Sequence, residues 1–373
     1  MSKAVPVNTP SVGGNELKYL SECIQTGWIS SEGPFIAEFE KRFSQYIGTS
    51  FGVAVSSGSA ALDIAVQAMG IGPGDEVIMP AFTIISPAQS VVRAGGKPVL
   101  VDCDSKTWNI NVHEIEAKIT PKTKAIIVVH IYGLPVDMDP VIAVAKKHNL
   151  KVIEDAAEMH GQTYKGRMCG SLADLSIFSF YPNKHITTGE GGMLMCNDAD
   201  LAAKCAKLRN LAFETTGRRF IHHELGWNYR MTNMQAALGL AQLEQIDSFI
   251  EKKRKIGHYY QEKLNFLKSK GFDLPLESTE YAENIYWVFA MVTSSEKENE
   301  DLNGFLAKNK IGTRPFFWCM HEQPVFLKMG LFKDESYPVS EKIARNGFYI
   351  PSGLGLTVED QDIVVQTIKS FYE

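Results

Sequence analysis

Cysteine is scarce in this sequence, and the spacing of the few thiols excludes two common roles. The 373 residues contain six cysteines and no CxxC pair. Isolated thiols of this kind indicate neither a disulfide framework nor a zinc ribbon. No HExxH or HxxxH pattern accompanies the nine histidines, so we expect no metal site. The thiols, which we expect to be reduced and mostly buried, are Cys23, Cys103, Cys169, Cys196, Cys205 and Cys319.

Long apolar runs and a strong excess of charge are also absent. No stretch approaches the roughly 18 consecutive apolar residues of a membrane span, and residues 1–10 lack the pattern of a secretory leader. The 38 basic and 43 acidic residues give a net charge of −5, and the basic residues are scattered. Such a distribution does not favour binding to nucleic acid or to a membrane. We therefore expect a cytoplasmic protein that acts on small molecules.

The remaining composition is that of an ordinary globular protein, with 45% hydrophobic and 22% charged residues. At about 150 residues per domain, this length favours two domains. Apolar positions recur near a helical period over residues 233–264, and we expect one long helix there, close to a domain boundary. We accordingly predict a large domain at residues 1–245 and a smaller α+β domain at residues 246–373.

Short β-branched runs alternate with helical periodicities through the first 200 residues. This alternation predicts an α/β fold with a mostly parallel central sheet flanked by helices. We expect strands at residues 51–55, 76–79, 98–101, 125–131, 151–154, 175–180, 193–196 and, in the smaller domain, 286–292. We expect the other helices at residues 16–25, 60–69, 84–94, 112–119, 140–148, 302–308 and 358–372.

Two charged residues stand at positions where buried strands are expected to end. Asp155 follows the strand at 151–154, and a carboxylate there is costly unless it has a cationic partner, such as a protonated pyridine nitrogen. Lys184 follows the strand at 175–180 and precedes the Gly-rich turn at 187–192. Desolvation lowers the pKa of such a lysine and frees a nucleophilic amine for a Schiff base. Both groups can then meet one aromatic ring from opposite ends.

A hydroxyl-rich turn provides the features of a phosphate site. Ser57, Gly58 and Ser59 join a predicted strand to a predicted helix, where backbone N–H groups and the helix dipole attract an anion. Ser179 can add a second hydroxyl, and Phe82 can lie against a ring. Phosphate cradle, ring stack, pyridinium partner and Schiff-base lysine are together what pyridoxal phosphate requires.

Each of these features also has an ordinary structural interpretation. Asp155 can cap a helix, the hydroxyls of Ser57 and Ser59 can be no more than an N-cap, and Phe82 can belong to the core. His185, beside the lysine, is expected to be structural. The glycine turn at 189–192 lacks the nucleotide-loop patterns GxGxxG and GxxxxGK[ST]. Candidate residues for an anionic substrate are Arg230, Arg314 and His321, although Arg314 can equally brace a loop.

Several segments, in this order along the chain, carry a resemblance to a known family. The sequence resembles the fold-type I pyridoxal phosphate enzymes, and specifically the DegT-like sugar aminotransferases, over nearly its whole length. The resemblance implies an aspartate aminotransferase-like fold. The matching segments are Gly27-Trp28-Ile29-Ser30, Gly74-Asp75-Glu76-Val77-Ile78, His130-Ile131-Tyr132-Gly133, Glu154-Asp155-Ala156-Ala157, Phe178-Ser179-Phe180, Lys184 with 187–192, and Asn228-Tyr229-Arg230-Met231-Thr232.

The resemblance also implies a role for individual residues. Lys184 would form the Schiff base, Asp155 would hold the ring nitrogen, and Glu158 would contact the ring hydroxyl. Ser57, Gly58, Ser59 and Ser179 would bind the phosphate. Asn228 would reach the phosphate of a second subunit, which implies an obligate homodimer with shared sites. The family commonly has a histidine near the cofactor at the position of His160.

The implied reaction takes an amino group from L-glutamate, holds it as pyridoxamine phosphate and passes it to a keto-sugar for cell-surface polysaccharide such as the O-antigen of lipopolysaccharide. The pattern is most similar to perosamine synthase-like enzymes, which aminate C4 of a GDP-linked 4-keto-6-deoxy sugar. Pro182 and His185 depart from that branch. One alternative is amination at C8 of an oxidised 3-deoxy-octulosonate sugar. A dehydratase, in which histidine replaces the lysine, and a cofactor-binding regulator without turnover are less favoured.

Overall fold

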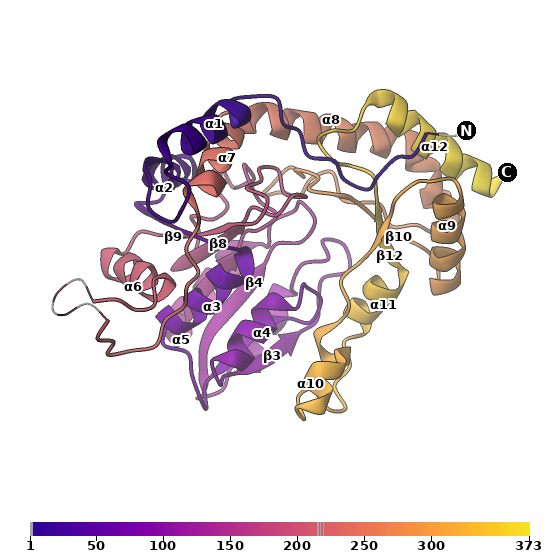
Figure 1. The fold of residues 1–373 in the computed structure, drawn as a ribbon. Coiled ribbons are helices and arrows are strands. Elements are labelled where there is room, and N and C mark those ends of the chain that lie inside the picture. The colour runs from indigo at the N-terminus through magenta and orange to yellow at the C-terminus, as the bar shows by residue number, and fades with distance from the viewer. Residues whose placement is uncertain (1–2, 215, 217, 219) are drawn as a thin grey trace.

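A seven-stranded sheet forms the centre of the molecule in the computed structural model, which describes residues 3–214, 216, 218 and 220–373 (Figure 1). The strand order is β1-β9-β8-β5-β4-β2-β3. Only β9 runs against its neighbours, and the other adjacent pairs are parallel. The mostly parallel α/β sheet predicted from the sequence is confirmed. The strands are β1 (Phe51–Val55), β2 (Glu76–Pro80), β3 (Lys97–Val101), β4 (Thr123–Val129), β5 (Lys151–Asp155), β8 (Leu175–Ser179) and β9 (Gly192–Cys196).

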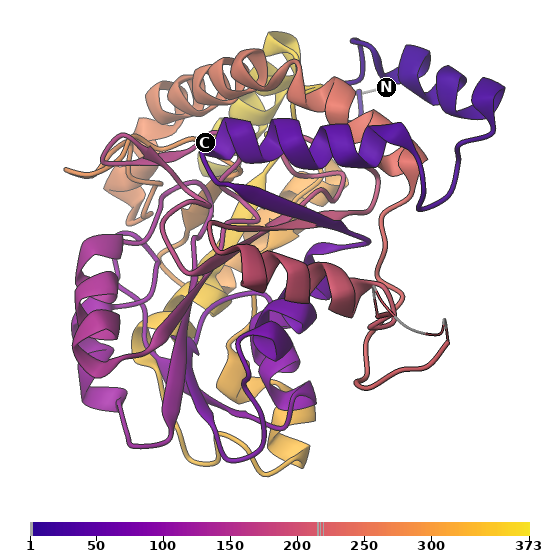
Figure 2. The same cartoon turned by 90° about the vertical axis from the view of Figure 1, so that its left-hand side faces the viewer.

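Successive strand residues enter cores on opposite faces of this sheet. On β2, for example, Val77 and Met79 join one hydrophobic cluster and Ile78 joins the other. Both faces are covered with helices, as the second view shows (Figure 2), which explains why the strand sequences are apolar on both sides. The first cluster takes residues from α3 (Gly58–Ala68), α4 (Ser86–Arg93) and α6 (Ala199–Arg209). The second takes residues from α2 (Pro34–Ile47), α5 (Met138–His148), α7 (Asn233–Leu243) and the start of α8 (Ile246–Leu264), with α1 (Glu16–Thr26) lying against α7.

A smaller three-stranded sheet of order β10-β12-β11 lies toward the C-terminus. The hydrophobic cluster around this sheet also includes Val5, so the N-terminal segment packs against the C-terminal part of the chain. The predicted division after residue 245 stays a prediction. The elements here are β10 (Phe289–Val292), α9 (Glu296–Lys308), β11 (Arg314–Pro315), α10 (Pro324–Lys328), α11 (Pro338–Asn346), β12 (Gly347–Ile350) and α12 (Val358–Tyr372).

Two helix predictions are wrong. Residues 112–119 form two short 3₁₀ turns (Val112–Glu114 and Glu116–Lys118) in place of a helix. The helix expected over 233–264 is interrupted, because α7 ends at Leu243 and α8 begins at Ile246. The side chain of Glu244, at the break, accepts hydrogen bonds from Asn15 and Tyr19 of the N-terminal segment. The contacts at this interruption are therefore tertiary, and no glycine or proline at residues 244–245 marks it in the sequence.

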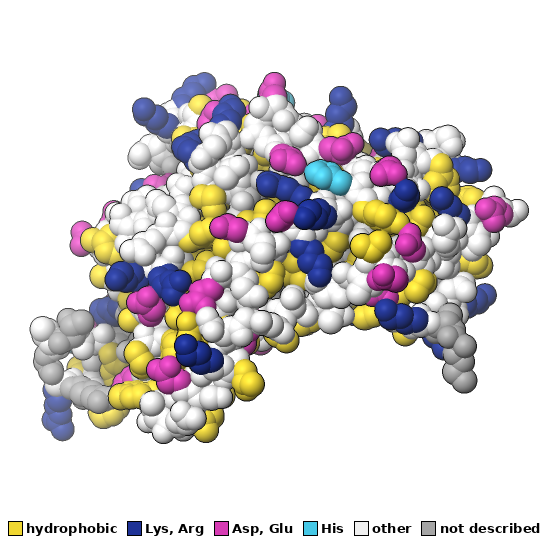
Figure 3. All heavy atoms as spheres, turned by 90° about the horizontal axis from the view of Figure 1, so that it is seen from above, with side chains coloured by type: hydrophobic (Ala, Val, Ile, Leu, Met, Phe, Trp, Pro, Cys, Tyr) yellow, Lys and Arg dark blue, Asp and Glu magenta, His cyan; other side chains and the backbone are white. Residues whose placement is uncertain are grey.

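Other features of the chain agree with the composition. All six cysteines are free and buried. In the part of the chain that the structure describes, no helix is long and apolar enough to cross a membrane. Seen from above, the molecule carries acidic and basic side chains interspersed with apolar ones (Figure 3). A two-stranded ribbon, β6 (Thr163–Tyr164) with β7 (Arg167–Met168), extends from the loop after β5.

Candidate active site

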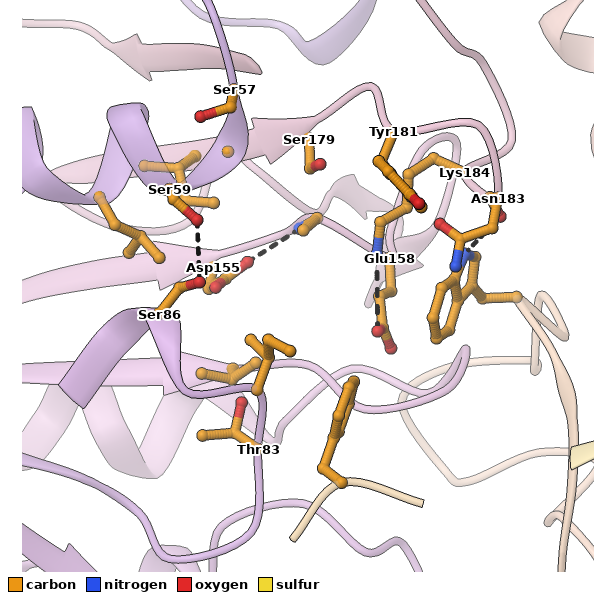
Figure 4. A pocket seen from close by; sticks show the side chains of 18 of the residues that line it. Ser57, Ser59, Thr83, Ser86, Asp155, Glu158, Ser179, Tyr181, Asn183 and Lys184 are labelled. Atoms are coloured by element: carbon orange, nitrogen blue, oxygen red, sulfur yellow. Dashed lines mark hydrogen bonds and ion pairs between the residues drawn. The ribbon is translucent and has the colours of Figure 1, made fainter. Parts of the chain in front are cut away.

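Polar side chains from several elements converge on a cavity of about 350 Å³. The cavity lies where β5 and β8 end and where α3 begins, and the carboxyl edge of a parallel sheet is where α/β proteins place their ligands. Figure 4 shows these side chains pointing into one space from separate elements. The polar residues that line the cavity are Ser57, Ser59, Thr83, Ser86, Asp155, Glu158, Ser179, Tyr181, Asn183, Lys184, Glu190 and Tyr349.

Lys184 lies in the turn after β8, where its backbone N–H donates to the carbonyl of Tyr181 (2.9 Å). Its side chain is only 11% exposed, and its Nζ lies 3.6 Å from Oε1 of Glu158. The indole of Trp287 covers the same atom, with Nζ 4.0 Å from the ring centroid. Burial lowers the pKa of Lys184, while the carboxylates of Glu158 and Asp155 oppose that shift. The environment therefore increases the share of neutral, nucleophilic amine.

Asp155 is the last residue of β5 and is buried, with one carboxylate oxygen accepting the N–H of Ala157 (3.1 Å). Burial raises the pKa of its carboxyl to about 6, although the hydrogen bond from Ala157 and the positive charge of Lys184 pull it down. A carboxyl in this state gains from an additional cationic partner inside the cavity. A protonated ring nitrogen would be such a partner.

Glu158 lies three residues further on and faces Lys184. Its other oxygen, Oε2, accepts the backbone N–H of Tyr132 (2.8 Å). Tyr132 has a φ of +55°, in the left-handed region that side chains rarely occupy, and this conformation presents its N–H to the carboxylate. Burial raises the pKa of Glu158 to about 7, against the opposing charge of Lys184. Glu158 is therefore held in place by the backbone while its protonation is finely balanced.

The start of α3 has the geometry of an anion-binding turn, at the place where the sequence predicts a phosphate site. The hydroxyl oxygen of Ser57 caps the helix by accepting the N–H of Ala60 (3.1 Å). The first N–H groups of a helix have no partner within it and point toward the cavity end. A Cβ added to Gly58 would lie 2.8 Å from Cβ of Ser179, so this close approach requires glycine. The structure also brings in a hydroxyl missed from the sequence, because Ser59 and Ser86 are hydrogen-bonded (2.9 Å).

Glu154 and Asp155 are adjacent on β5 but serve opposite faces. Glu154 lies 3.0 Å from Nε2 of His130, whose Nδ1 accepts the N–H of Val136 (2.9 Å). Together with Cys169, these two residues are near enough to one another to hold a metal ion. Both histidine nitrogens are already used, however, and we assign the cluster a structural role. The carboxylate of Glu154 also accepts hydrogen bonds from Gly170, Leu172 and Ser176.

Three predicted site residues lie away from the cavity lining. Phe82 is fully buried and packs against the rings of Phe316, Phe317 and Tyr132, while the next two residues line the cavity in its place. His160 is buried among the rings of the second core, and burial lowers its pKa to about 3. His321 is buried and pairs with Glu341 (3.0 Å). The geometry gives none of the three a contact with the cavity.

Three further predicted residues, Asn228, Arg230 and Arg314, also lie outside the cavity lining. Asn228 is exposed and accepts a hydrogen bond from Arg230 (3.0 Å), which also donates to Asn210 (2.7 Å). Neither Asn228 nor Arg230 lines the cavity of its own chain. Arg314 lines a smaller neighbouring cavity of about 220 Å³. The two cavities share Tyr181, Asn183, Trp287 and Tyr349.

No local sequence pattern predicts the aromatic wall of the site. Trp287, Phe317 and Tyr349 come from the C-terminal part, more than 100 residues after Lys184, and each reads locally as a core aromatic. Only the packing of the two parts brings them to the cavity. Indole N–H donation from Trp287 to the carbonyl of Asn183 (3.0 Å) then joins this wall to the lysine turn.

These residues fit pyridoxal 5′-phosphate. A glycine-dependent cradle at a helix N-terminus suits the phosphate, a buried carboxylate suits the ring nitrogen, and a desolvated lysine suits the carbonyl carbon. The fold and the site together define a pyridoxal phosphate-dependent aminotransferase.

Comparison with known proteins supports this assignment. The model of the DegT/DnrJ/EryC1/StrS aminotransferase family matches residues 10–369, and the chain belongs to this family. It is 40% identical to the GDP-perosamine synthase of Escherichia coli O157:H7 over 99% of both chains. It is 42% identical to that of Caulobacter vibrioides, covering 98% of this chain and 97% of the relative. The putative sugar aminotransferase Spr1654 from Streptococcus pneumoniae, in its PMP form, is 26% identical with a TM-score of 0.92, covering 99% of this chain and 97% of that one.

The predicted family, fold type and cofactor are thus confirmed, and the chain is a pyridoxal phosphate-dependent sugar aminotransferase. The PLP form of the same Streptococcus pneumoniae protein superposes with a TM-score of 0.91. The roles assigned to individual residues stay predictions that the geometry supports to different degrees.

Proposed function

We propose that this aminotransferase moves the amino group of L-glutamate to C4 of a nucleotide-linked 4-keto-6-deoxy sugar, as in the formation of GDP-perosamine for cell-surface polysaccharide such as O-antigen. The observation that carries the proposal is the buried Lys184, Glu158 and Asp155 set in a chain about 40% identical to GDP-perosamine synthases over its length. The cytoplasm, where we expect the protein, is a prediction from the sequence.

Asp155 and Lys184 have different roles in the proposed reaction. Bound pyridoxal phosphate supplies the electron sink that makes the bond from the amino-acid Cα to hydrogen labile. Asp155 holds positive charge at the ring nitrogen, because its buried carboxylate is most stable beside a cation. Lys184, once its amine is free, would take the proton from Cα of the amino donor and would deliver it to C4′ of the cofactor. Its lowered pKa suits both directions of that transfer.

The surrounding residues would bind and orient the cofactor. Ser57, Gly58, Ser59 and Ser179 hold the phosphate at the start of α3. Glu158, fixed by the N–H of Tyr132, faces Lys184 and would contact the ring hydroxyl. These contacts leave the amine of Lys184 as the group that is free to move.

Arg314 is proposed to bind an anionic part of a substrate. Its guanidinium donates to the carbonyl of Thr313 (3.1 Å) and makes no ion pair with a carboxylate of the described residues. The cavity that it lines opens onto the wall formed by Tyr181 and Tyr349. A carboxylate of L-glutamate or a phosphate of the nucleotide has the charge for this position.

The homodimer is likewise a proposal. Asn228 is exposed and outside the cavity of its own chain, as a residue that serves a second subunit must be. The chain also exposes several large apolar side chains, and exposed apolar surface often marks an interface. They include Trp28, Ile29, Leu211, Ile221 and Leu225.

The alternatives are less well supported. The relatives compared above are named GDP-perosamine synthases, which does not favour amination at C8 of an octulosonate sugar. The presence of Lys184 opposes a dehydratase that uses histidine at this position. The complete set of chemical groups opposes a regulator without turnover.

The first experiment is a visible absorbance titration of the purified holoprotein. L-glutamate should remove the absorbance of bound pyridoxal phosphate, and L-aspartate and L-alanine should do so at least about tenfold more slowly. A GDP-linked 4-keto-6-deoxy sugar should then restore it. Restoration by an 8-oxo-3-deoxy-octulosonate instead would replace the proposed substrate, and no response to any amino donor would exclude transamination.

A further inference from the structure

Lys253 is a buried cation that the assigned chemistry does not use. It lies on α8, and only 3% of it is exposed, whereas its neighbour Lys255 is on the charged outer face. The top of the molecule, along which α8 runs, shows this outer face with its interspersed charges (Figure 3). No carboxylate of the described residues forms an ion pair with Lys253. Burial lowers the pKa of its amine to about 7.

Two backbone carbonyls are its partners. Nζ donates to the carbonyl oxygen of Trp287 at 2.6 Å and to that of Ser352 at 2.5 Å. A buried ammonium or amine group is costly unless it is hydrogen-bonded, and these two contacts meet that requirement. Lys253 therefore ties α8 to the segment before β10 and to the segment after β12.

One of these carbonyls belongs to the wall of the active site. The indole of Trp287 covers Nζ of Lys184 at 4.0 Å, and its N–H donates to the carbonyl of Asn183, the preceding residue. The contacts thus connect Lys253, through the backbone and indole of Trp287, to Lys184.

The course of this segment is unusual and depends on α8. Tyr286 has a φ of +51°, which a bulky residue seldom adopts, and its N–H is held by the side chain of Asn284 (2.7 Å). A Cβ on Gly257, one turn after Lys253, would lie 2.2 Å from the Tyr286 ring. Gly257 leaves room for the ring of Tyr286, and Lys253 holds the next residue, Trp287, by its carbonyl.

We propose that Lys253 is a positioning residue for amino transfer: by fixing the peptide of Trp287, it holds the indole over Nζ of Lys184. A ring face in this position restricts the amine and shields it from water. This inference rests on the aminotransferase assignment and on the expected role of Lys184.

The test compares Lys253→Met with Lys255→Met, a matched substitution on the exposed side of the same helix. Two quantities are measured: the single-turnover rate with L-glutamate, and the rate at which acetic anhydride modifies Lys184 in cofactor-free protein, followed by mass spectrometry. Lys253→Met should lower the turnover rate by about tenfold or more, with KM for L-glutamate within about threefold of wild type. It should also make Lys184 at least about threefold more reactive, and Lys255→Met should change neither value.

A second variant, Trp287→Leu, shows whether the effect passes through the indole. If it does, Trp287→Leu should change both quantities in the same direction, and the double variant should be no worse than the poorer single variant. Effects that multiply in the double variant would overturn the proposal, as would wild-type values in Lys253→Met. If Lys253→Met fails to fold, Trp287→Leu decides: Lys184 reactivity within twofold of wild type would overturn the proposal. Because the acetylation assay needs neither cofactor nor donor, failure of L-glutamate as donor leaves it intact.

Discussion

Lys184 and Glu158 form a buried pair in which Nζ lies 3.6 Å from Oε1. Burial shifts the two groups in opposite directions, lowering the pKa of the lysine and raising that of the glutamate to about 7. Because the two groups interact closely, they titrate as a pair. A lysine in this state loses its proton more readily than an exposed lysine does, which suits an amine that is expected to bind a carbonyl and to move protons.

Replacement of this lysine gives the most direct prediction. Lys184→Ala should abolish the visible absorbance change with L-glutamate and lower turnover by at least about 10³-fold, because no other group that lines the cavity in the described residues offers an amine. Absorbance spectroscopy and steady-state rates measure this. Lys151→Ala, at the exposed start of β5, is the control and should behave as wild type. Wild-type colour and turnover in Lys184→Ala would disprove the assignment.

Asp155→Asn should separate stability from activity. The pKa of Asp155 is raised from 3.8 to about 6, so the folded cofactor-free protein holds this proton more tightly than the unfolded chain does. Its contribution to stability is therefore full below about pH 4 and is lost as the pH rises through about 6. At pH 7 the neutral asparagine should make cofactor-free protein more stable, on the order of 2 kcal/mol. The same variant should lose about 10²-fold or more in turnover with cofactor bound, because the ring nitrogen loses its carboxylate.

Urea unfolding of cofactor-free protein at pH 4 and at pH 7 tests the stability arm. The wild type should show a larger decrease in the free energy of unfolding between these two values than Asp155→Asn does. Equal pH dependence in the two proteins would contradict the assigned burial of this charge. Unchanged turnover would contradict its role at the ring nitrogen.

Gly58→Ala should weaken cofactor binding without unfolding the protein. The added methyl group would lie 2.8 Å from Cβ of Ser179, so one wall of the phosphate cradle must move. We expect the dissociation constant for pyridoxal phosphate to rise by about tenfold or more. Titration of cofactor-free protein by visible absorbance gives this constant. Gly304→Ala, in an open position on α9, is the matched control, and equal constants for the two variants would remove Gly58 from the cradle.

The sequence predicts the sheet well because each strand carries its own local signal. The short apolar runs at 51–55 and 193–196 coincide with β1 and β9. Helix α2, with its buried Phe39 and Phe43, was missed altogether, although Pro34 marks its start and Gly48 its end. The interruption between α7 and α8 depends on contacts of Glu244 with residues more than 200 positions away, which no local pattern contains.

The site shows the same division. Lys184, Asp155 and the turn at 57–59 adjoin strands that the sequence reveals, so their convergence follows from the topology of a parallel sheet. Phe82 was expected in the wrong place, because a side chain directly after a strand can turn to either the core or the cavity. Trp287 and Lys253 could not be predicted at all, since their contacts form only when the C-terminal part packs on the large sheet.

The proposed sharing of sites between subunits makes a prediction about mixtures of inactive proteins. If Asn228 serves the partner's phosphate site, Lys184→Ala and Asn228→Ala homodimers should each be nearly inactive. In the heterodimer both substitutions would fall on one site and leave the other intact. After subunit exchange at equal concentrations, activity should recover to about a quarter of wild type, because half of the dimers are mixed and each has one intact site. Exchange must be confirmed independently with a tagged subunit, and no recovery after confirmed exchange would return Asn228 to a role within its own chain.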